Sequence, residues 1–291
     1  MTRGSLDRIA SATGIVCVLA LDHRDAMRNT FRRAGVENVT ADEMLETKAR
    51  IVEAVADNGA TGVLLDHAAA HACRPDGIGL LVPLEAQGHE QLDGARLNRL
   101  EFTAEDALRL GADGCKLLLH YRPDHAASAQ RQRELVARAA DDCHRRGLPL
   151  VLEPLVYLLE GEAEGDYRSA FADLVVRGAA DLAGSGADLL KLQYPGDDAA
   201  CARLTEAASP LRWVLLGGGD GDPETFATAL ETACRAGASG FMAGRTIWGG
   251  ALGLGPTEQR RWLAGQAGPL FARVSALAHA HATGITPSRA Q

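Results

Sequence analysis

The segment GADLLKLQYPG (186–196) decides the fold. As a β-strand, it places Leu190 and Leu192 on one face and Lys191 on the other. Strands buried on both faces are usually continuous apolar runs of Val, Ile and Leu. A lysine inside such a run must reach water or be buried at a considerable free-energy cost. The segment therefore predicts a buried strand that carries an amine for a reason other than packing.

Short apolar runs like this one alternate with longer helical patterns along the whole chain. Besides 187–195 within the first segment, the runs are residues 14–22, 61–66, 77–85, 114–121, 148–157, 212–219 and 240–245. Eight strand-then-helix units in about 250 residues are typical of a TIM barrel. The alternative is a doubly wound open sheet, but the first run is not followed by the G-x-G-x-x-G pattern of such folds. We expect an α/β fold, a single-domain (β/α)8 barrel over 1–280, and a loose tail over 281–291.

Helix start and stop signals lie between the runs. Thr40 and Glu43 have capping-box spacing, and Gly59 follows the last turn of the same pattern. Asp222 precedes Pro223 as an N-cap residue precedes the first helical position. A short helix is also expected within the first ten residues.

Composition excludes several classes of protein. The 291 residues are 46% hydrophobic, and the net charge of −8 disfavours nucleic acid or an anionic membrane as a partner. No apolar run approaches the roughly 20 residues of a membrane span, and the N-terminus lacks a secretory apolar region. The six cysteines form no C-x-x-C pair, which indicates reduced thiols in a cytoplasmic protein.

Three ionisable residues lie inside predicted strands: Lys116, Glu153 and Lys191. Catalytic residues of TIM barrels come from the carboxyl ends of the strands, so we expect these side chains to meet at the mouth. A buried ion-pair network that only fills the barrel is the structural alternative. Burial and a second ammonium lower the pKa of an amine, and a neutral lysine forms a Schiff base with a ketone. Glu153 could then carry protons for the carbinolamine.

The other half of the mouth is predicted to bind phosphate. The sequence LLGGGDGDPETF (215–226) is a glycine-rich turn before a helix, where backbone N–H groups can converge on an anion. Arg245 follows the eighth run and is a bidentate partner for phosphate. Loops after the seventh and eighth strands often form such a site in TIM barrels.

Six of these segments together resemble one family. They are LALDHRDAMR, GCKLLLHYRPD, PLVLEPLVY, DLLKLQYP, VLLGGGDGDPETF and GFMAGRTIWGGA. In order and position they resemble the class I ketose-phosphate aldolases of the tagatose-1,6-bisphosphate and sulfofructose-1-phosphate aldolase type. The resemblance implies that Lys191 forms the Schiff base, Lys116 assists carbonyl chemistry, Glu153 is the general acid/base and Asp22 orients the substrate.

The resemblance further implies a lyase without cofactor or metal that cleaves a ketose 1-phosphate into dihydroxyacetone phosphate and an aldehyde. It assigns the phosphate to Gly218, Gly219, Gly244 and Arg245, and implies a cytoplasmic homo-oligomer that acts on a small-molecule sugar phosphate. No nucleic-acid or membrane partner is expected.

Two positions depart from the family pattern, and both concern substrate recognition. His23 replaces a glutamine, and Gly217 replaces a serine. His23 and the adjacent Arg24 are expected to bind substrate, and with His120 and Arg122 they predict a second anionic group, a phosphate or a sulfonate. Protonated histidines would strengthen that binding as the pH falls towards six.

Two other functions remain open from the residues alone. A metal-dependent lyase or hydrolase could use His67 and His71, at i, i+4 spacing, with His89 or His120 as a third ligand. A non-catalytic barrel could bind a sugar phosphate without cleaving it, although binding alone needs no buried amine.

Overall fold

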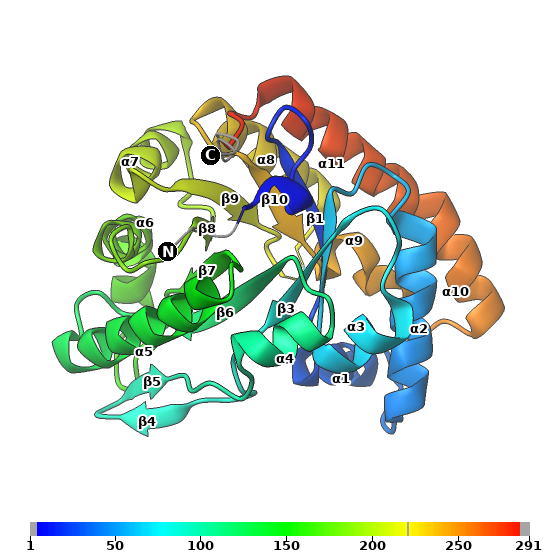
Figure 1. Ribbon diagram of the computed structural model, residues 1–291, viewed down its shortest axis with the longest axis horizontal. Coiled ribbons are helices and arrows are strands. Elements are labelled where there is room, and N and C mark those ends of the chain that lie inside the picture. The colour runs from blue at the N-terminus through cyan, green and yellow to red at the C-terminus, as the bar shows by residue number, and fades with distance from the viewer. Residues whose placement is uncertain (1–4, 220, 286–291) are drawn as a thin grey trace.

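Eight parallel strands close into a barrel in the order β1-β10-β9-β8-β7-β6-β3-β2 (Figure 1). The computed structural model describes residues 5–219 and 221–285. The barrel strands are β1 (Val16–Leu21), β2 (Gly62–Leu65), β3 (Gly79–Pro83), β6 (Gly114–His120), β7 (Leu150–Leu155), β8 (Leu189–Leu192), β9 (Arg212–Leu216) and β10 (Gly240–Ala243). Each lies within one of the eight predicted runs, so the TIM barrel is confirmed.

Helices surround the barrel (Figure 1). They are α1 (Asp25–Arg33), α2 (Ala41–Val55), α3 (His67–Cys73), α4 (Ala104–Arg109), α5 (Ala126–Arg145), α6 (Glu164–Leu182), α7 (Asp198–Ala208), α8 (Pro223–Arg235), α9 (Arg245–Trp248), α10 (Pro256–Trp262) and α11 (Gly268–His281). Short 3-10 helices are η1 (Asp7–Ile9) and η2 (Gly249–Ala251), and η3 (Leu263–Ala267) is a π-helix. Thr40 and Glu43 form the predicted capping box, and Asp222 caps α8. In the described part of the chain, no helix has the length and apolarity that crossing a membrane requires.

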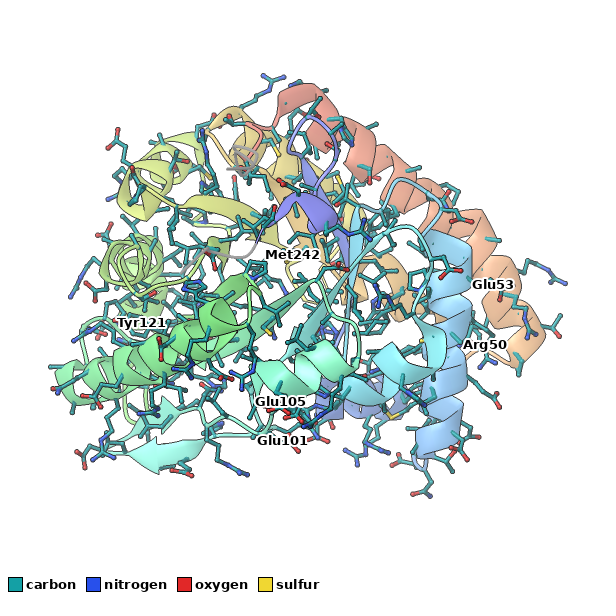
Figure 2. All side chains as sticks on the ribbon, in the orientation of Figure 1. Arg50, Glu53, Glu101, Glu105, Tyr121 and Met242 are labelled. Atoms are coloured by element: carbon teal, nitrogen blue, oxygen red, sulfur yellow. The ribbon has the colours of Figure 1, made fainter. Side chains whose placement is uncertain are left out.

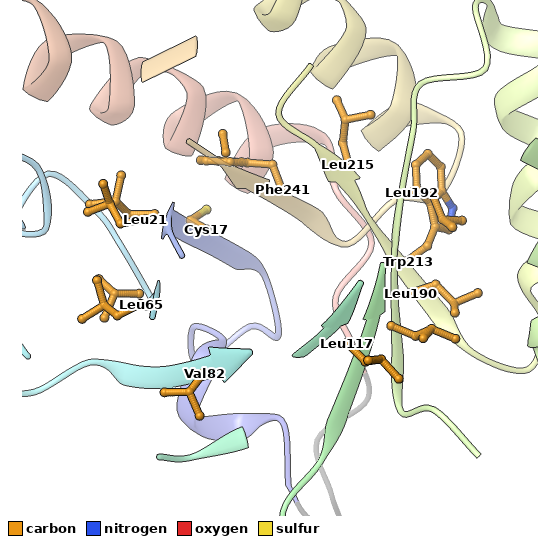
Figure 3. Close-up of a cluster of buried hydrophobic side chains, with 14 of the residues drawn as sticks. Cys17, Leu21, Leu65, Val82, Leu117, Leu190, Leu192, Trp213, Leu215 and Phe241 are labelled. Carbon is orange, nitrogen blue, oxygen red and sulfur yellow. The ribbon is translucent and has the colours of Figure 1, made fainter. Parts of the chain in front are cut away.

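Alternation along the strands separates two apolar layers. The layer inside the barrel contains Val16, Val18, Ala20, Leu64, Leu81, Val151, Leu189, Val214 and Met242, and Met242 is labelled near the barrel centre in Figure 2. The larger layer lies between strands and helices, and Figure 3 shows part of it, including Leu190 and Leu192. Because these two leucines face outward, Lys191 faces the barrel interior, as its position between them predicts.

The floor of the barrel is closed by residues near both ends of the described chain. Ile9 in η1 and Ile285 are both buried against the interior layer. The Ile285 N–H donates to the Gly14 carbonyl over 2.8 Å, and the Thr283 N–H donates to that of Ala238 over 3.0 Å. The expectation of a loose tail is therefore wrong for residues 281–285, because Ile285 fills an apolar space. Residues 286–291 of that tail lie outside the described residues.

A small hairpin follows β3 and was not predicted. Its strands are β4 (Glu90–Leu92) and β5 (Ala95–Leu97), which pair antiparallel and project below α5 in Figure 1. The turn residues Asp93 and Gly94 have φ angles of 51° and 80°. An Asp-Gly pair with positive φ at both positions is a favoured two-residue hairpin turn, so this dipeptide was the signal available in the sequence.

Candidate active site

A cavity of about 360 Å³ lies at the carboxyl ends of the barrel strands. Nine of the ten predicted site residues line it: Asp22, His23, Arg24, Lys116, Glu153, Lys191, Gly219, Gly244 and Arg245. Gly218 is the exception and is exposed beside the cavity. Residues from six different strands or strand ends therefore meet in one place, as the barrel topology requires.

Lys116 stands at the centre of three carboxylates. Its Nζ lies 2.8 Å from Asp22 Oδ2, 2.7 Å from Glu85 Oε1 and 3.1 Å from Glu153 Oε2. The side chain is only 2% exposed. An ammonium group has three N–H donors, and three carboxylate oxygens match them.

Lys191 lies on the other side of Glu153. The register of Val151 with Leu189 and of Leu152 with Leu190 brings Glu153 beside Lys191 on the next strand. Lys191 Nζ lies 3.0 Å from Glu153 Oε2, the same oxygen that Lys116 contacts. One carboxylate oxygen therefore bridges the two amines.

The carboxylates determine the charge of Lys116. Burial alone would lower the pKa of Lys116, but the charges of Asp22, Glu153 and Glu85 outweigh it and raise that pKa well above its ordinary value. The expectation that burial and a second ammonium lower the pKa is therefore wrong for Lys116. Burial raises the carboxyl pKa values of Asp22 and Glu153, yet the nearby lysines outweigh it and leave both below their usual range.

Glu85 is a site residue that the sequence analysis did not select. Its Oε1 accepts from Lys116, and its Oε2 accepts from the Leu118 N–H over 3.1 Å. Burial, followed by the charge of Asp22, raises the pKa of Glu85 although Lys116 opposes the shift. Its position as the last residue of the run 77–85 was the available signal.

The glycine turn after β9 packs directly on the start of α9. The Thr246 hydroxyl contacts the Gly217 carbonyl and donates to the Gly219 carbonyl over 2.9 Å. The position of a Cβ on Gly219 would be 3.4 Å from Arg245 Nη2. Thr246, which was not predicted, therefore holds the turn so that Gly219 and Arg245 face the same part of the cavity.

The glycine that departs from the family pattern occupies a position without room for a side chain. A Cβ on Gly217 would lie 2.6 Å from Ala243 Cα and 2.9 Å from Ala243 Cβ. A Cβ on Gly244 would lie 2.6 Å from the Ala20 carbonyl oxygen and 2.8 Å from His23 Cε1. A serine at 217 would therefore require β9 and β10 to separate.

Trp248, also not predicted, positions the second departure, His23. The Trp248 Nε1–H donates to the Ala20 carbonyl over 3.0 Å, and its ring meets the His23 ring edge-on with centroids 5.4 Å apart. Burial, opposed by the charge of Asp22, lowers the pKa of His23 to about 4. Burial likewise lowers the pKa of His120 to about 4. The expected protonation of these histidines near pH six is therefore wrong.

The two arginines of the expected anion cluster already have carboxylate partners. Arg122 is 2% exposed and donates to Asp124 and to Glu162, each over 2.8 Å. Arg24 donates to Glu101 Oε2 and to the Glu85 carbonyl, each over 2.9 Å. Arg122 does not line the cavity, so its predicted contact with substrate is wrong, because sequence position alone did not reveal its ion pairs.

The lowered pKa values of both histidines predict a pH-dependent stability. Between pH 6.5 and about 4, His23 and His120 bind protons in the unfolded chain but not in the folded one. The free energy of unfolding should therefore fall as the pH is lowered through this interval, by up to about 5 kcal/mol for the two histidines together. Urea denaturation at pH 7 and pH 4.5 measures this change in the free energy of unfolding. His120→Gln should flatten the dependence, whereas an unchanged slope in that variant would contradict the assignment.

The histidines of the alternative metal site do not form one in the described residues. Within residues 5–219 and 221–285, no group of three or more His, Cys, Asp or Glu side chains could hold a metal ion. His67 Nε2 lies 3.0 Å from the Pro83 carbonyl, and its ring stacks on Phe102 at 3.5 Å. The proposed histidine site is therefore not supported by the geometry of the described residues.

Known proteins similar to this chain include aldolases and a synthase. The chain matches the DeoC/LacD family aldolase model over residues 16–250. It is 25% identical to tagatose 1,6-diphosphate aldolase 1 of Streptococcus mutans, with 90% of each chain covered. It is 31% identical to 2-amino-3,7-dideoxy-D-threo-hept-6-ulosonate synthase of Halobacterium salinarum, and the match spans 74% of this chain and 77% of the synthase. In fold it resembles an archaeal fructose 1,6-bisphosphate aldolase, with a TM-score of 0.69, 21% identity, and coverage of 94% and 97%.

A closed α/β barrel with two lysines and three carboxylates buried at its mouth defines a class I aldolase, a lyase that forms a Schiff base. The extent of the family match then identifies the branch. The chain belongs to the DeoC/LacD aldolase family.

Proposed function

We propose that this aldolase cleaves a ketose 1-phosphate between C3 and C4 into dihydroxyacetone phosphate and an aldehyde, through a Schiff base on Lys191. The observation that carries the proposal is the contrast between the two buried amines. Lys116 is surrounded by three carboxylates, whereas the carboxylate that Lys191 contacts, among the described residues, is Glu153. An amine held by three carboxylates stays charged and has no lone pair for attack on a ketone, which leaves Lys191 as the nucleophile of this proposal.

The covalent step begins with Glu153. It takes a proton from Lys191, whose neutral Nζ attacks the ketone carbon C2 and moves a proton to the carbonyl oxygen. Glu153 then returns its proton to the resulting hydroxyl, which leaves as water. The product is an iminium that withdraws electrons from the neighbouring carbon.

Bond cleavage uses the same carboxylate. Glu153 removes the proton of the C4 hydroxyl, the C3–C4 bond breaks, and its electron pair moves into the iminium to form an enamine. The aldehyde leaves first. Protonation of the enamine at C3 and hydrolysis then release dihydroxyacetone phosphate and free Lys191.

The remaining predicted residues have supporting roles in this proposal. Lys116 and Asp22, 2.8 Å apart, would orient the hydroxyl groups around the ketone. The C1 phosphate would be held by Gly218, Gly219, Gly244 and Arg245. His23 and Arg24, which follow β1, would contact the substrate. The cytoplasmic homo-oligomer implied by the family resemblance stays a prediction.

Borohydride reduction tests the proposed function. Incubation with dihydroxyacetone phosphate and borohydride should add one covalent adduct, found by mass spectrometry on the peptide that contains Lys191. Cleavage activity should also survive EDTA. An adduct on Lys116, no adduct, or activity lost to EDTA and restored by zinc would refute the proposal.

Arg245→Ala should weaken phosphate recognition without removing the Schiff-base chemistry. Arg245 lines the cavity, and its Nη2 would lie 3.4 Å from a Cβ on Gly219 in the proposed phosphate site. Removing a charged contact of this kind costs about 2–5 kcal/mol, so KM for a ketose 1-phosphate should rise by at least about thirtyfold. Steady-state kinetics measure it, with Arg245→Lys as the control that keeps the charge. Equal KM values in Arg245→Ala and wild type would place the phosphate elsewhere.

A further inference from the structure

The barrel order defines which end of the cavity is farthest from the proposed phosphate site. In the closed ring, β3 and β6 lie opposite β9 and β10, from which Gly219 and Arg245 follow. The residues of the cavity at that far end, here called the distal wall, are Gln87, Gly88, Asn98, His120 and Leu155, the last from the neighbouring strand β7. A substrate held at C1 by the glycine turn and at C2 by Lys191 would direct its last carbons towards this wall.

We propose that the distal wall takes an uncharged group, so that the substrate is a ketose monophosphate with a hydroxyl or methyl group at its far carbon. This rests on the proposed function, because it assumes that the C1 phosphate lies at Arg245. It also replaces the expectation of a second phosphate or sulfonate.

The hydrogen bonds of the distal wall leave one ring nitrogen of His120, Nε2, as a hydrogen-bond acceptor. Asn98 Oδ1 accepts from the backbone N–H of His120 over 2.7 Å and from Gln132 Nε2 over 3.2 Å. The same oxygen lies 3.2 Å from His120 Nδ1, and because an amide oxygen only accepts, this contact favours the tautomer with the ring proton on Nδ1. His120 Nε2 then has a lone pair, since burial holds the pKa of the ring at about 4. A lone pair binds a hydroxyl donor and repels a phosphate oxygen.

Of three described arginines near the distal wall, two have carboxylate partners, and the third, Arg96, does not line the cavity. Arg122 is buried against Asp124 and Glu162, and the Arg96 guanidinium lies 4.7 Å above the Tyr157 ring. Arg24 reaches the cavity but donates to Glu101, which Figure 2 labels beside α4.

A distal phosphate at Arg24 would therefore compete with the carboxylate of Glu101 and lie near Asp25, which also lines the cavity. It would lose water at a wall whose five residues include no arginine or lysine, which is unfavourable. Leu155 adds apolar surface at the same place, where a hydroxyl or methyl group loses little on leaving water.

The test is condensation of dihydroxyacetone phosphate with D-glyceraldehyde or with D-glyceraldehyde 3-phosphate. These aldehydes differ at the carbon that would face the distal wall. We expect kcat/KM to be at least about tenfold higher for the unphosphorylated aldehyde, corresponding to one unfavourable charge contact. Equal or better use of the phosphorylated aldehyde would overturn the inference, and a loss of that use in Arg24→Ala would identify Arg24 as the phosphate ligand.

The borohydride adduct with dihydroxyacetone phosphate alone separates this inference from the proposed function. That adduct involves no distal group. A protein that forms the adduct but prefers the phosphorylated aldehyde keeps its proposed function and loses the inference. A protein that forms no adduct loses the proposed function.

A charge placed on the distal wall should reverse the preference. Leu155→Lys introduces a cation there, and Leu155→Met is the uncharged control of similar length. We expect Leu155→Lys to shift the ratio of kcat/KM values towards the phosphorylated aldehyde by about tenfold or more, and Leu155→Met to leave the ratio unchanged. Gln87→Lys, at an exposed position of the same wall, repeats the test if Leu155→Lys does not fold. If neither lysine moves the ratio, the far carbon does not face this wall and the inference is wrong.

Discussion

Replacing Lys191 with methionine is expected to lower kcat for aldol cleavage by at least about 10⁴-fold. Methionine fills a similar volume but has no amine, so the iminium that accepts the electron pair of the C3–C4 bond cannot form. The borohydride adduct with dihydroxyacetone phosphate should disappear with the activity. Steady-state kinetics and intact-mass measurement on the same preparation test both outcomes.

Lys191→Arg is the matched variant for this prediction. Arginine keeps a cation near Glu153, which Lys191 contacts over 3.0 Å, but its guanidinium is not a nucleophile at neutral pH. It should be as inactive as Lys191→Met while unfolding at a urea concentration closer to that of wild type. Residual adduct on Lys116 in either variant would show that the nucleophile has been assigned to the wrong lysine.

Glu153→Gln is expected to lower kcat by about 10²- to 10⁴-fold, the usual range for a lost acid/base group. Glutamine has nearly the same shape but cannot accept the proton of the C4 hydroxyl. The variant should still bind a ketose 1-phosphate, because Gly219 and Arg245 remain in place. Kinetics and equilibrium binding of the substrate distinguish lost turnover from lost binding.

Glu85→Gln is the control for Glu153→Gln. Glu85 contacts Lys116, as Glu153 does, but it has no part in the proposed proton transfers at Lys191. Its loss should therefore reduce turnover less than the loss of Glu153. A Glu153→Gln enzyme within about threefold of wild type would mean that another group, such as Asp22, carries the proton.

The strand pattern made most of the fold and much of the site predictable. Each strand of the barrel is a local apolar run, and alternation within a run determines which side chains face inward. Lys116, Glu153 and Lys191 could therefore be placed together before any tertiary contact was known. The glycine turn and Arg245 followed from their positions after the last two strands.

Contacts between distant parts of the chain were not predictable in this way. Arg122 appeared available for an anion, but Glu162, forty residues later, pairs with it. The charge of Lys116 likewise depends on Asp22 and Glu85, from two other strand ends. Such ion pairs join residues that are far apart in the chain. They leave no repeating pattern in a single sequence from which they could be predicted.

The oxygen of Glu153 that bridges the two amines has a further consequence for how rigid this site can be. When Lys191 passes from ammonium to iminium, its nitrogen keeps one positive charge, and the only species that leaves is neutral water. Glu153 therefore faces a cation at nearly the same point before and after the covalent bond forms. The neighbouring side chains need not reorient to solvate a new charge. A site held rigid by ion pairs can therefore form the iminium without rearranging.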